Sequence, residues 1–204
     1  MQSIKKDAIG GFNSFIDQQK PVPGKAILSL ILFNCEYVIL YSGKDIKDVE
    51  YLNESSYVPN GSTALVDAIG KTLNDRSSTE GKPGSPDKYL VVILTDGEEN
   101  ASREYTSLAI SKMIEDLRNK GNWEFIFLAA NQDAFSVARG MNISVDNSMN
   151  FTADSVSVNT TFRKMSKGSQ MYRSSSLSDN TVSVMKSASL EVDKEMEEEA
   201  KNSK

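Results

Sequence analysis

Two polar residues stand at positions where α/β proteins gather ligands. Asp96 follows an unbroken apolar run at residues 89–94, and Thr63 follows a tight turn at the start of a predicted helix. Because the carboxyl ends of parallel strands meet at one edge of an open sheet, both side chains are expected at that edge. A carboxylate and a hydroxyl, with waters between them, suit Mg²⁺ or Mn²⁺, which bind oxygen ligands. Each residue also has a structural interpretation, with Ser62 or Thr63 as a helix N-cap and Asp96-Gly97 as a turn.

The composition excludes several kinds of chemistry. The chain has no His and a single cysteine, Cys35, so it offers no Ser-His-Asp triad, no imidazole metal site and no internal disulfide. Gly70-Lys71-Thr72 resembles the end of a P-loop, but Leu65 occupies the place of the required first glycine. Any metal site must therefore use oxygen ligands.

Charge and hydropathy bound the partners and the location. The formal net charge is −5, with no basic stripe, so a nucleic-acid partner is not expected. No signal peptide and no long apolar segment is visible, which predicts a cytoplasmic protein with no membrane contact.

Helical and strand-like patterns alternate along the chain. Helical stripes predict helices at 4–19, from 62–63 to about 73, at 106–120, at 133–140 with Asp133 as cap, and at 154–173. Apolar runs predict buried strands at 26–33, 89–94 and 123–129, a short strand at 149–151, and an antiparallel edge strand at 37–41. Residues 74–88, rich in Ser, Gly and Pro, are expected to form an exposed loop. This order predicts an α/β, Rossmann-like three-layer sandwich with a mostly parallel sheet in which 89–94 is a central strand.

The C-terminal segment differs from the rest. Serines dominate to residue 189, and residues 190–204 carry six acidic residues and three lysines. We therefore expect one domain over 1–173 and a Ser-rich, acidic tail over 174–204 that is disordered or a solvated helix.

Three segments together resemble the von Willebrand factor A (VWA) domain, especially its small bacterial and phage forms. Gly61-Ser62-Thr63 opening a helix is similar to the second loop of the family's metal-ion-dependent adhesion site (MIDAS). The run Val-Val-Ile-Leu-Thr-Asp-Gly at 91–97 is similar to the strand and third loop, and the resemblance continues through residues 123–134. It implies a VWA-like fold over about 1–173, with Thr63 and Asp96 as metal ligands.

The chain departs from the family at its beginning. The family's first central strand ends in Asp-x-Ser-x-Ser, whereas this sequence starts with Met1-Gln2-Ser3 where that loop should finish. The resemblance therefore implies an N-terminally truncated domain in which Mg²⁺ or Mn²⁺ binding is weak or lost, with Ser3 as a weak substitute. It also predicts that 26–33 and 89–94 pair directly, that the sheet shows a gap, or that an upstream segment or a partner chain supplies a strand.

The resemblance implies a non-enzymatic protein-binding module in which a partner's Asp or Glu completes the metal coordination. One alternative is a metal-dependent enzyme of phosphate chemistry that uses Asp96. It would recruit further acids from among Asp45, Asp67, Glu98 and Glu99. Another is a structural phage or assembly component that binds through its tail without metal. The sequence leaves the oligomeric state open.

Overall fold

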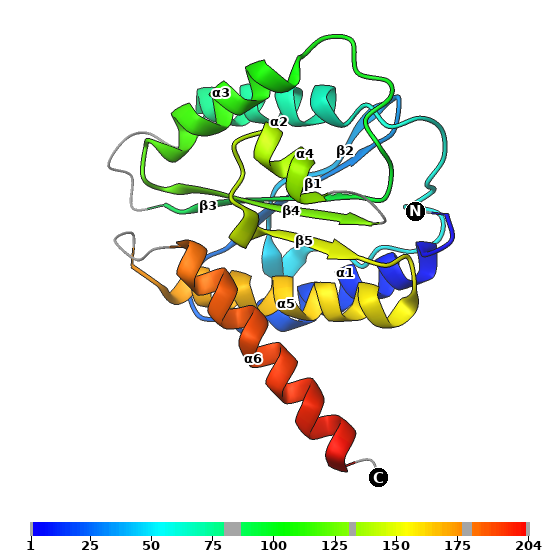
Figure 1. Cartoon of the computed structure of the whole chain (residues 1–204), viewed down its shortest axis with the longest axis vertical. Coiled ribbons are helices and arrows are strands. Elements are labelled where there is room, and N and C mark those ends of the chain that lie inside the picture. Colours follow the sequence, from blue (N-terminus) through cyan, green and yellow to red (C-terminus); the bar gives the residue numbers. More distant parts are fainter. Residues whose placement is uncertain (1, 80–86, 131–133, 177–180, 203–204) are drawn as a thin grey trace.

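The protein has a mixed α/β fold built around a parallel sheet (Figure 1). The computed structural model describes residues 2–79, 87–130, 134–176 and 181–202. Strands β3 (Tyr89–Thr95), β4 (Trp123–Ala130) and β5 (Ser148–Phe151) pair in parallel in the order β3-β4-β5. Strands β1 (Ile27–Phe33) and β2 (Tyr37–Asp45) form a separate antiparallel hairpin. The predicted α/β class is confirmed, and the architecture is consistent with a Rossmann-like fold.

Helices cover both faces of the parallel sheet (Figure 1). On one face lie α2 (Leu65–Thr79), α3 (Ser107–Arg118) and α4 (Ala134–Gly140). On the other lie α1 (Lys5–Gln19), the 3₁₀ turn Ile46–Asp48 and α5 (Ser155–Ser174). A second 3₁₀ turn, Val145–Asn147, precedes β5. Among the described residues, no helix has both the length and the apolar composition needed to cross a bilayer.

Strand β4 divides the core into two layers. All its residues are buried. Phe125 and Phe127 pack with α2 and α3, while Ile126 and Leu128 pack with α1 and α5. Successive side chains of a strand point to opposite faces, which explains why a continuous apolar run is needed here. The sequence predicted this strand correctly.

The predicted helical stripes are confirmed, with one exception. Their buried residues are Ile4, Ala8, Phe12 and Ile16 near or in α1, Leu65, Ala68, Ile69 and Leu73 in α2, and Val158, Phe162, Met165 and Tyr172 in α5. In α3, Ile110, Ile114 and Leu117 are buried, but Ala109 is exposed. The buried row of α3 is formed by Ile110, Ile114 and Leu117. Ala109 lies one residue outside this row, so its side chain turns away from the sheet.

The end of helix α2 differs from the sequence expectation. Helix α2 continues to Thr79, into the segment 74–88 expected as a loop, because polar residues such as Arg76 remain compatible with an exposed helical face. The Arg76 guanidinium donates to the hydroxyl of Ser42 on β2 at 2.8 Å. Residues 80–86 and the expected cap Asp133 lie outside the described residues.

Strand β3 is not central, contrary to expectation. It is paired with β4 on one side only, and no ladder joins it to β1 among the described residues. Of the three arrangements predicted for 26–33 and 89–94, the structure has the gap. β3 therefore keeps an unpaired edge toward the hairpin.

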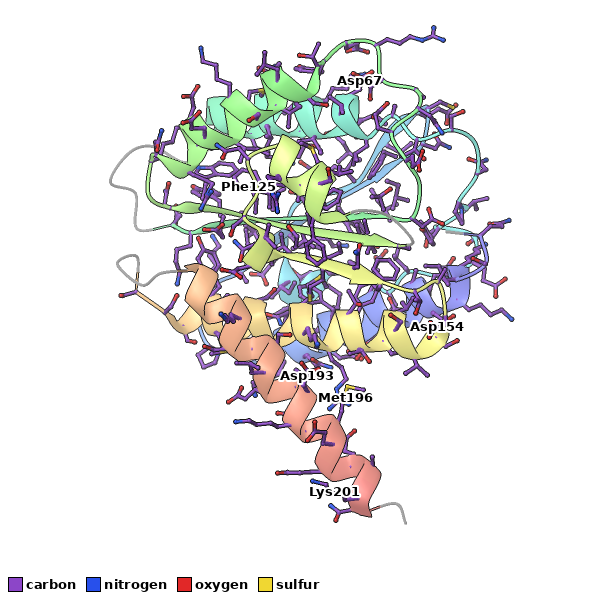
Figure 2. All side chains as sticks on the ribbon, in the orientation of Figure 1. Asp67, Phe125, Asp154, Asp193, Met196 and Lys201 are labelled. Atoms are coloured by element: carbon purple, nitrogen blue, oxygen red, sulfur yellow. The ribbon has the colours of Figure 1, made fainter. Side chains whose placement is uncertain are left out.

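The C-terminal segment forms helix α6 (Thr181–Asn202), the helical one of the two predicted alternatives. Ala188 and Val192 are buried, with exposed fractions of 0% and 2%. In Figure 2 Asp193 and Met196 lie where α6 crosses α5, whereas Lys201 stands beyond the body of the protein. The helix is thus docked over part of its length rather than solvated on every side.

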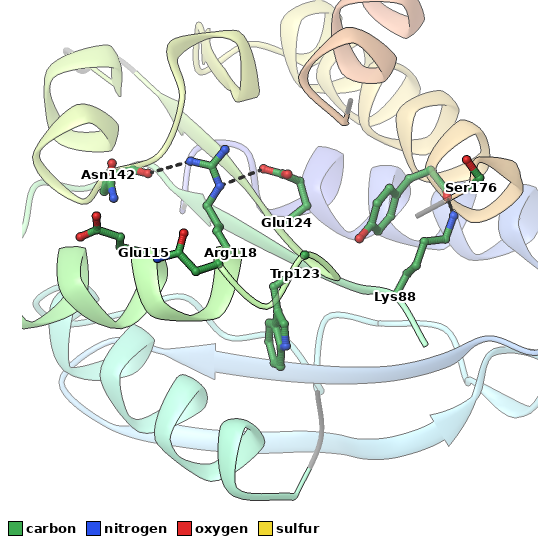
Figure 3. Close-up of a pocket in the computed structure, with 10 residues that line it drawn as sticks. Lys88, Glu115, Arg118, Trp123, Glu124, Asn142 and Ser176 are labelled. Carbon is green, nitrogen blue, oxygen red and sulfur yellow. Dashed lines mark hydrogen bonds and ion pairs between the residues drawn. The ribbon is translucent and has the colours of Figure 1, made fainter. Parts of the chain in front are cut away.

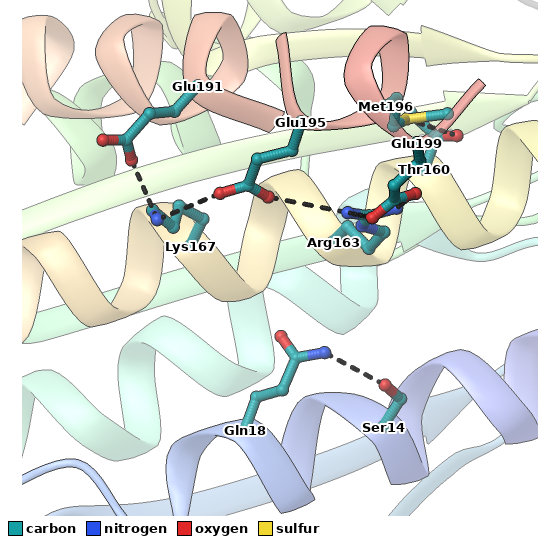
Figure 4. Close-up of polar contacts among 9 residues, drawn as sticks. All are labelled: Ser14, Gln18, Thr160, Arg163, Lys167, Glu191, Glu195, Met196 and Glu199. Atoms are coloured by element: carbon teal, nitrogen blue, oxygen red, sulfur yellow. Dashed lines mark hydrogen bonds and ion pairs between the residues drawn. The ribbon is translucent and has the colours of Figure 1, made fainter. Parts of the chain in front are cut away.

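Ion pairs between α5 and α6 accompany this apolar contact (Figure 4). Lys167 lies 2.9 Å from Glu191 and 3.4 Å from Glu195. Arg163 lies 3.0 Å from Glu199, and Lys164 lies 2.7 Å from Asp193. The acidic residues that made the tail look disordered thus face a row of basic residues on α5.

Candidate functional site

The two predicted site residues come from neighbouring loops at the carboxyl edge of β3. A Cβ built on Gly97 would lie 2.6 Å from the Thr63 hydroxyl, so the Thr63 side chain rests directly against the residue that follows Asp96. Thr63 and Asp96 are both half-buried. Only a glycine at 97 leaves room for this approach, which makes the Asp-Gly pair more than a turn.

Asn100 fixes the position of Thr63. The Thr63 amide donates to Asn100 Oδ1 at 2.9 Å, and the Asn100 amide donates to the Thr63 carbonyl at 3.1 Å. The turn after β3 is closed by Thr95, whose hydroxyl donates to the Gly97 carbonyl at 3.1 Å. Both loops are therefore held by hydrogen bonds in which side chains and backbone groups take part, and the Thr63 hydroxyl lies against Gly97.

The N-terminus of α2 is capped from a distant loop, so the expected cap at Ser62 or Thr63 is wrong. The helix begins at Leu65, and the Val66 amide donates to Glu99 Oε2 at 2.9 Å. The Asp67 amide donates to the Ser102 hydroxyl at 3.0 Å. A carboxylate here interacts favourably with the positive end of the helix dipole. Glu99 therefore takes the role that sequence reasoning gave to a local hydroxyl.

Glu99 is bonded on both carboxylate oxygens, not the free turn charge that its position after a strand indicates. Glu99 Oε1 accepts from the amides of Ala101 and Ser102 at 2.9 and 2.7 Å, and Oε2 accepts from the Ser102 hydroxyl at 2.6 Å. Burial alone would raise the pKa of the Glu99 carboxyl, but these hydrogen bonds outweigh it and lower the pKa.

Asp67 organises the remainder of the same loop. Its Oδ1 accepts from the amides of Glu104 and Tyr105 at 2.9 and 2.8 Å, and its Oδ2 accepts from the Arg103 amide at 2.8 Å. The residue is buried, with 7% of its surface exposed, and Figure 2 places it beside the loop that leads to α3. Burial raises the pKa of the Asp67 carboxyl, but the three amides outweigh this and hold it below its usual value.

The other acids considered for the site are not brought to it. Asp45 lies opposite Ile27 at the start of β1, at the far edge of the hairpin, and accepts from the Lys47 amide at 3.0 Å. Glu98 is exposed. Ser3 is exposed, and helix α1 begins after Ile4 with no side-chain cap, so Ser3 does not cap it.

The two residues that the sequence predicts as metal ligands, Thr63 and Asp96, supply one hydroxyl and one carboxylate. Within the described part of the chain, no group of three or more His, Cys, Asp or Glu residues is arranged to hold an ion. Mg²⁺ is commonly held by only one or two carboxylates, with waters and a bound partner filling the other positions. The prediction of Thr63 and Asp96 as metal ligands therefore stays a prediction, and it needs further ligands from water or from a bound partner.

A second cavity lies at the opposite edge of the sheet and has a different character (Figure 3). It has a volume of about 420 Å³ and lies beside the start of β4. The Arg118 guanidinium lies 3.8 Å from Glu124 and donates to the Asn142 carbonyl at 3.4 Å. The Lys88 ammonium donates to the carbonyls of Tyr172 and Ser175. Lys88, Arg118 and Glu124 thus contact other groups of the protein, and the cavity adds no donor to the predicted site.

Sequence reasoning missed the roles of Glu99, Asn100 and Asp67. An acidic residue in the first turn of a helix is a common pattern, and Asp67 shows it. The partners of Asp67 are 36 to 38 residues away along the chain, however. No local pattern indicates such pairs.

Comparison with models of known protein families finds no match, and comparison with curated protein sequences finds no significant match. The resemblance to the VWA domain therefore stays a prediction that rests on the residues quoted for it.

Proposed function

We propose that the chain is a non-enzymatic protein-binding module that contacts its partner at the carboxyl edge of β3. The observation that supports this is the close approach of the Thr63 hydroxyl to Gly97, the residue that follows Asp96 in the chain. In this proposal the pair holds Mg²⁺ or Mn²⁺ weakly, and an Asp or Glu of the partner completes the coordination. The metal and the partner then bind cooperatively, because the partner supplies a carboxylate ligand to the metal and the metal supplies the positive charge that this carboxylate binds.

The weakness of the site follows from its charge. A hard cation loses hydration when it binds, and negative ligands offset that cost. Asp67 and Glu99 already accept hydrogen bonds on both carboxylate oxygens, so their recruitment would break the loop. The same engagement weakens the phosphate-chemistry alternative, which counted these two acids as possible helpers of Asp96. A carboxylate from the partner adds the negative charge that the proposed site lacks, and it leaves the hydrogen bonds of Asp67 and Glu99 intact.

Calorimetric titration with MgCl₂ and with MnCl₂ tests the metal site. We expect weak binding to the wild type, a loss of at least about tenfold in affinity for Asp96→Ala, and no change for Glu98→Ala, which removes an exposed charge two residues away. Gly97→Ala is a second variant: it removes no ligand but displaces the Thr63 hydroxyl, and we expect weaker binding. Flat traces for both the wild type and Asp96→Ala would contradict the metal role.

The partner carboxylate is tested with small probes. The capped tripeptide Gly-Asp-Gly should tighten Mg²⁺ binding to the wild type, and Gly-Asn-Gly should not. Linkage requires that Mg²⁺ tighten binding of the Asp peptide by the same factor. If the two peptides act alike, the proposed carboxylate recognition is wrong.

A further inference from the structure

The two sheets face each other with unpaired edges. β1 is paired with β2 on one side, and β3 is paired with β4 on one side; no other strand among the described residues pairs with either. An edge strand presents a row of backbone N–H and C=O groups that can pair with an added strand. We call the space between these edges of β1 and β3 the strand slot.

Both strands belong to the same two layers of the core. Some of their side chains pack with the cluster of α2 and α3, and others pack with the cluster of α1 and α5. The first set is Phe33, Tyr89, Val91 and Ile93; the second is Leu28, Leu30, Leu90, Val92 and Leu94. The hairpin therefore continues the layer of the parallel sheet, and a strand in the slot would have apolar surroundings on both faces.

One peptide unit sets the width of the slot at its carboxyl end. The Ala64 amide donates to the Asn34 carbonyl at 2.8 Å, and the Thr63 carbonyl of the same peptide accepts from the Asn100 amide at 3.1 Å. Asn34 follows β1 and Asn100 lies in the loop after β3. A peptide unit that is hydrogen-bonded on both sides is what a middle strand presents, so the loops that follow β1 and β3 are about two strand spacings, or about 9–10 Å, apart where Asn34 and Asn100 lie. Because β1 and β3 both end here, they run in the same direction.

The exposure of the two strands agrees with an open slot. Every residue of β4 is buried, whereas in β3 only Ile93 and Thr95 are buried, and in β1 none is. The sequences of β1 and β3 are as apolar as that of β4. Apolar side chains and unpaired backbone groups are thus both accessible along one line, the combination that β-strand addition uses.

We propose that the strand slot binds an extended apolar segment of another polypeptide, which inserts parallel to β1 and β3 and joins the two sheets into one. The segment is about seven residues long, the length of β1 and of β3. It is apolar on both faces and rich in β-branched residues, because helices cover both sides of the layer. Main-chain hydrogen bonds supply affinity, and the alternating side chains fill the two clusters.

A synthetic peptide of seven alternating valines and isoleucines between pairs of lysines is the probe, and its control carries proline at alternate positions. Hydrogen exchange of the backbone amides is the measurement. In the free protein, alternate amides of β3 should exchange fast, because in a parallel pair only every second residue bonds to β4. The valine–isoleucine peptide should slow these amides and those of β1 more than tenfold, and the proline peptide should not.

The position of the N-terminus allows a tethered control. Ile4 and Ala8 line one small apolar space with Leu94, so the described chain begins near the carboxyl end of β3. The same strand sequence fused ahead of residue 1 through a Gly-Ser linker therefore has a high effective concentration at the slot. Protection by neither the free nor the tethered strand would overturn the proposal. Protection by the tethered strand alone would also overturn it, because the slot would then take a segment of its own chain.

Proline substitutions in β3 separate loss of binding from loss of folding. Val91 and Val92 are adjacent, so the amide of one faces β4 and the amide of the other faces the slot. One of Val91 and Val92 has the fast-exchanging amide that faces the slot. Replacing that residue by proline should leave the fold intact and abolish peptide binding, since proline is tolerated on a strand edge. Proline at the slow-exchanging position should unfold the sheet. Unchanged peptide binding in the folded variant would contradict insertion into the slot.

Discussion

Strands β4 and β1 have similar apolar sequences and different surroundings. β4 (Trp123–Ala130) has a hydrogen-bonded neighbour on each edge and helices on each face, and all its residues are buried. Within the described part of the chain β1 (Ile27–Phe33) pairs with β2 alone, and its residues are half-buried except Ile27, which is exposed. The difference shows that an apolar sequence alone does not bury a strand completely, and that full burial of β4 goes with a neighbour on each edge and helices on each face.

The partial exposure of β1 coincides with an edge that carries no ladder among the described residues. The helices of both layers are present on both sides of the slot, so the missing burial is not due to a missing helix. It follows the unpaired edges of β1 and β3. Strand β4 thus has a ladder on each edge, whereas β1 and β3 each have a ladder on one edge only among the described residues.

The largest effect is expected from removing the same side chain in the two regions. Ile126→Ala should lower the free energy of unfolding by about 2–5 kcal/mol, because Ile126 is fully buried and leaves a cavity. Ile31→Ala on β1 should cost about half as much or less, because solvent already reaches part of its side chain. Urea unfolding followed by circular dichroism measures both. Equal losses of unfolding free energy for the two variants would contradict the comparison. In the protein with a strand fused ahead of residue 1, Ile31→Ala should cost more than in the wild type, because the added strand would bury β1 more fully.

A smaller effect is expected from the loop that links the two regions. Asp67→Asn should lower the free energy of unfolding at pH 7 by about 1–3 kcal/mol, because a charged acceptor of three amides is replaced by a weaker one. Asp116→Asn on the exposed face of α3 is the control and should change little. Loosening of this loop should also raise exchange at the Ala64 amide, which bridges to the end of β1.

The pH dependence gives a second measurement on the same variant. The pKa of Asp67 is lower in the folded protein than its ordinary value, so its stabilising contribution is present above about pH 4 and is lost as the pH falls through the folded-state pKa. The wild type should therefore lose stability on acidification below about pH 4 more steeply than Asp67→Asn. Parallel stability curves for the two proteins would show that this carboxylate does not contribute as the hydrogen bonds indicate.

The smallest effect is expected at the α5–α6 contact, which lies outside both strand regions. Lys167→Met should lower the free energy of unfolding by less than about 1 kcal/mol, because exposed ion pairs contribute little. The difference between variant and wild type should shrink further in high salt, since salt screens surface charges. Thermal unfolding at low and high NaCl measures this. If Lys167→Met lowered the free energy of unfolding as much as Ile31→Ala does, ion pairs would contribute as much to stability as apolar burial in β1, and the expected order of effects would be wrong.

Local patterns predicted most of the elements. The stripe of Ile4, Phe12 and Ile16 predicted α1, and the apolar run at 123–129 predicted β4, because periodicity and continuity depend only on neighbouring residues. Thr63 and Asp96 were expected at one edge, and the structure brings Thr63 against Gly97. Their role in binding a metal stays a prediction.

Local patterns in the sequence predicted most of the helices and strands and their apolar faces, but not the full length of α2 or the helix formed by the tail. Only the tertiary structure decided that β3 is an edge strand, that Glu99 rather than Ser62 or Thr63 caps α2, and that α6 docks on α5. The physical reason is the same in all three cases. Pairing of strand edges, capping by a distant carboxylate and docking of a charged helix each depend on partners that are far apart in the chain, and no periodicity within a segment records them.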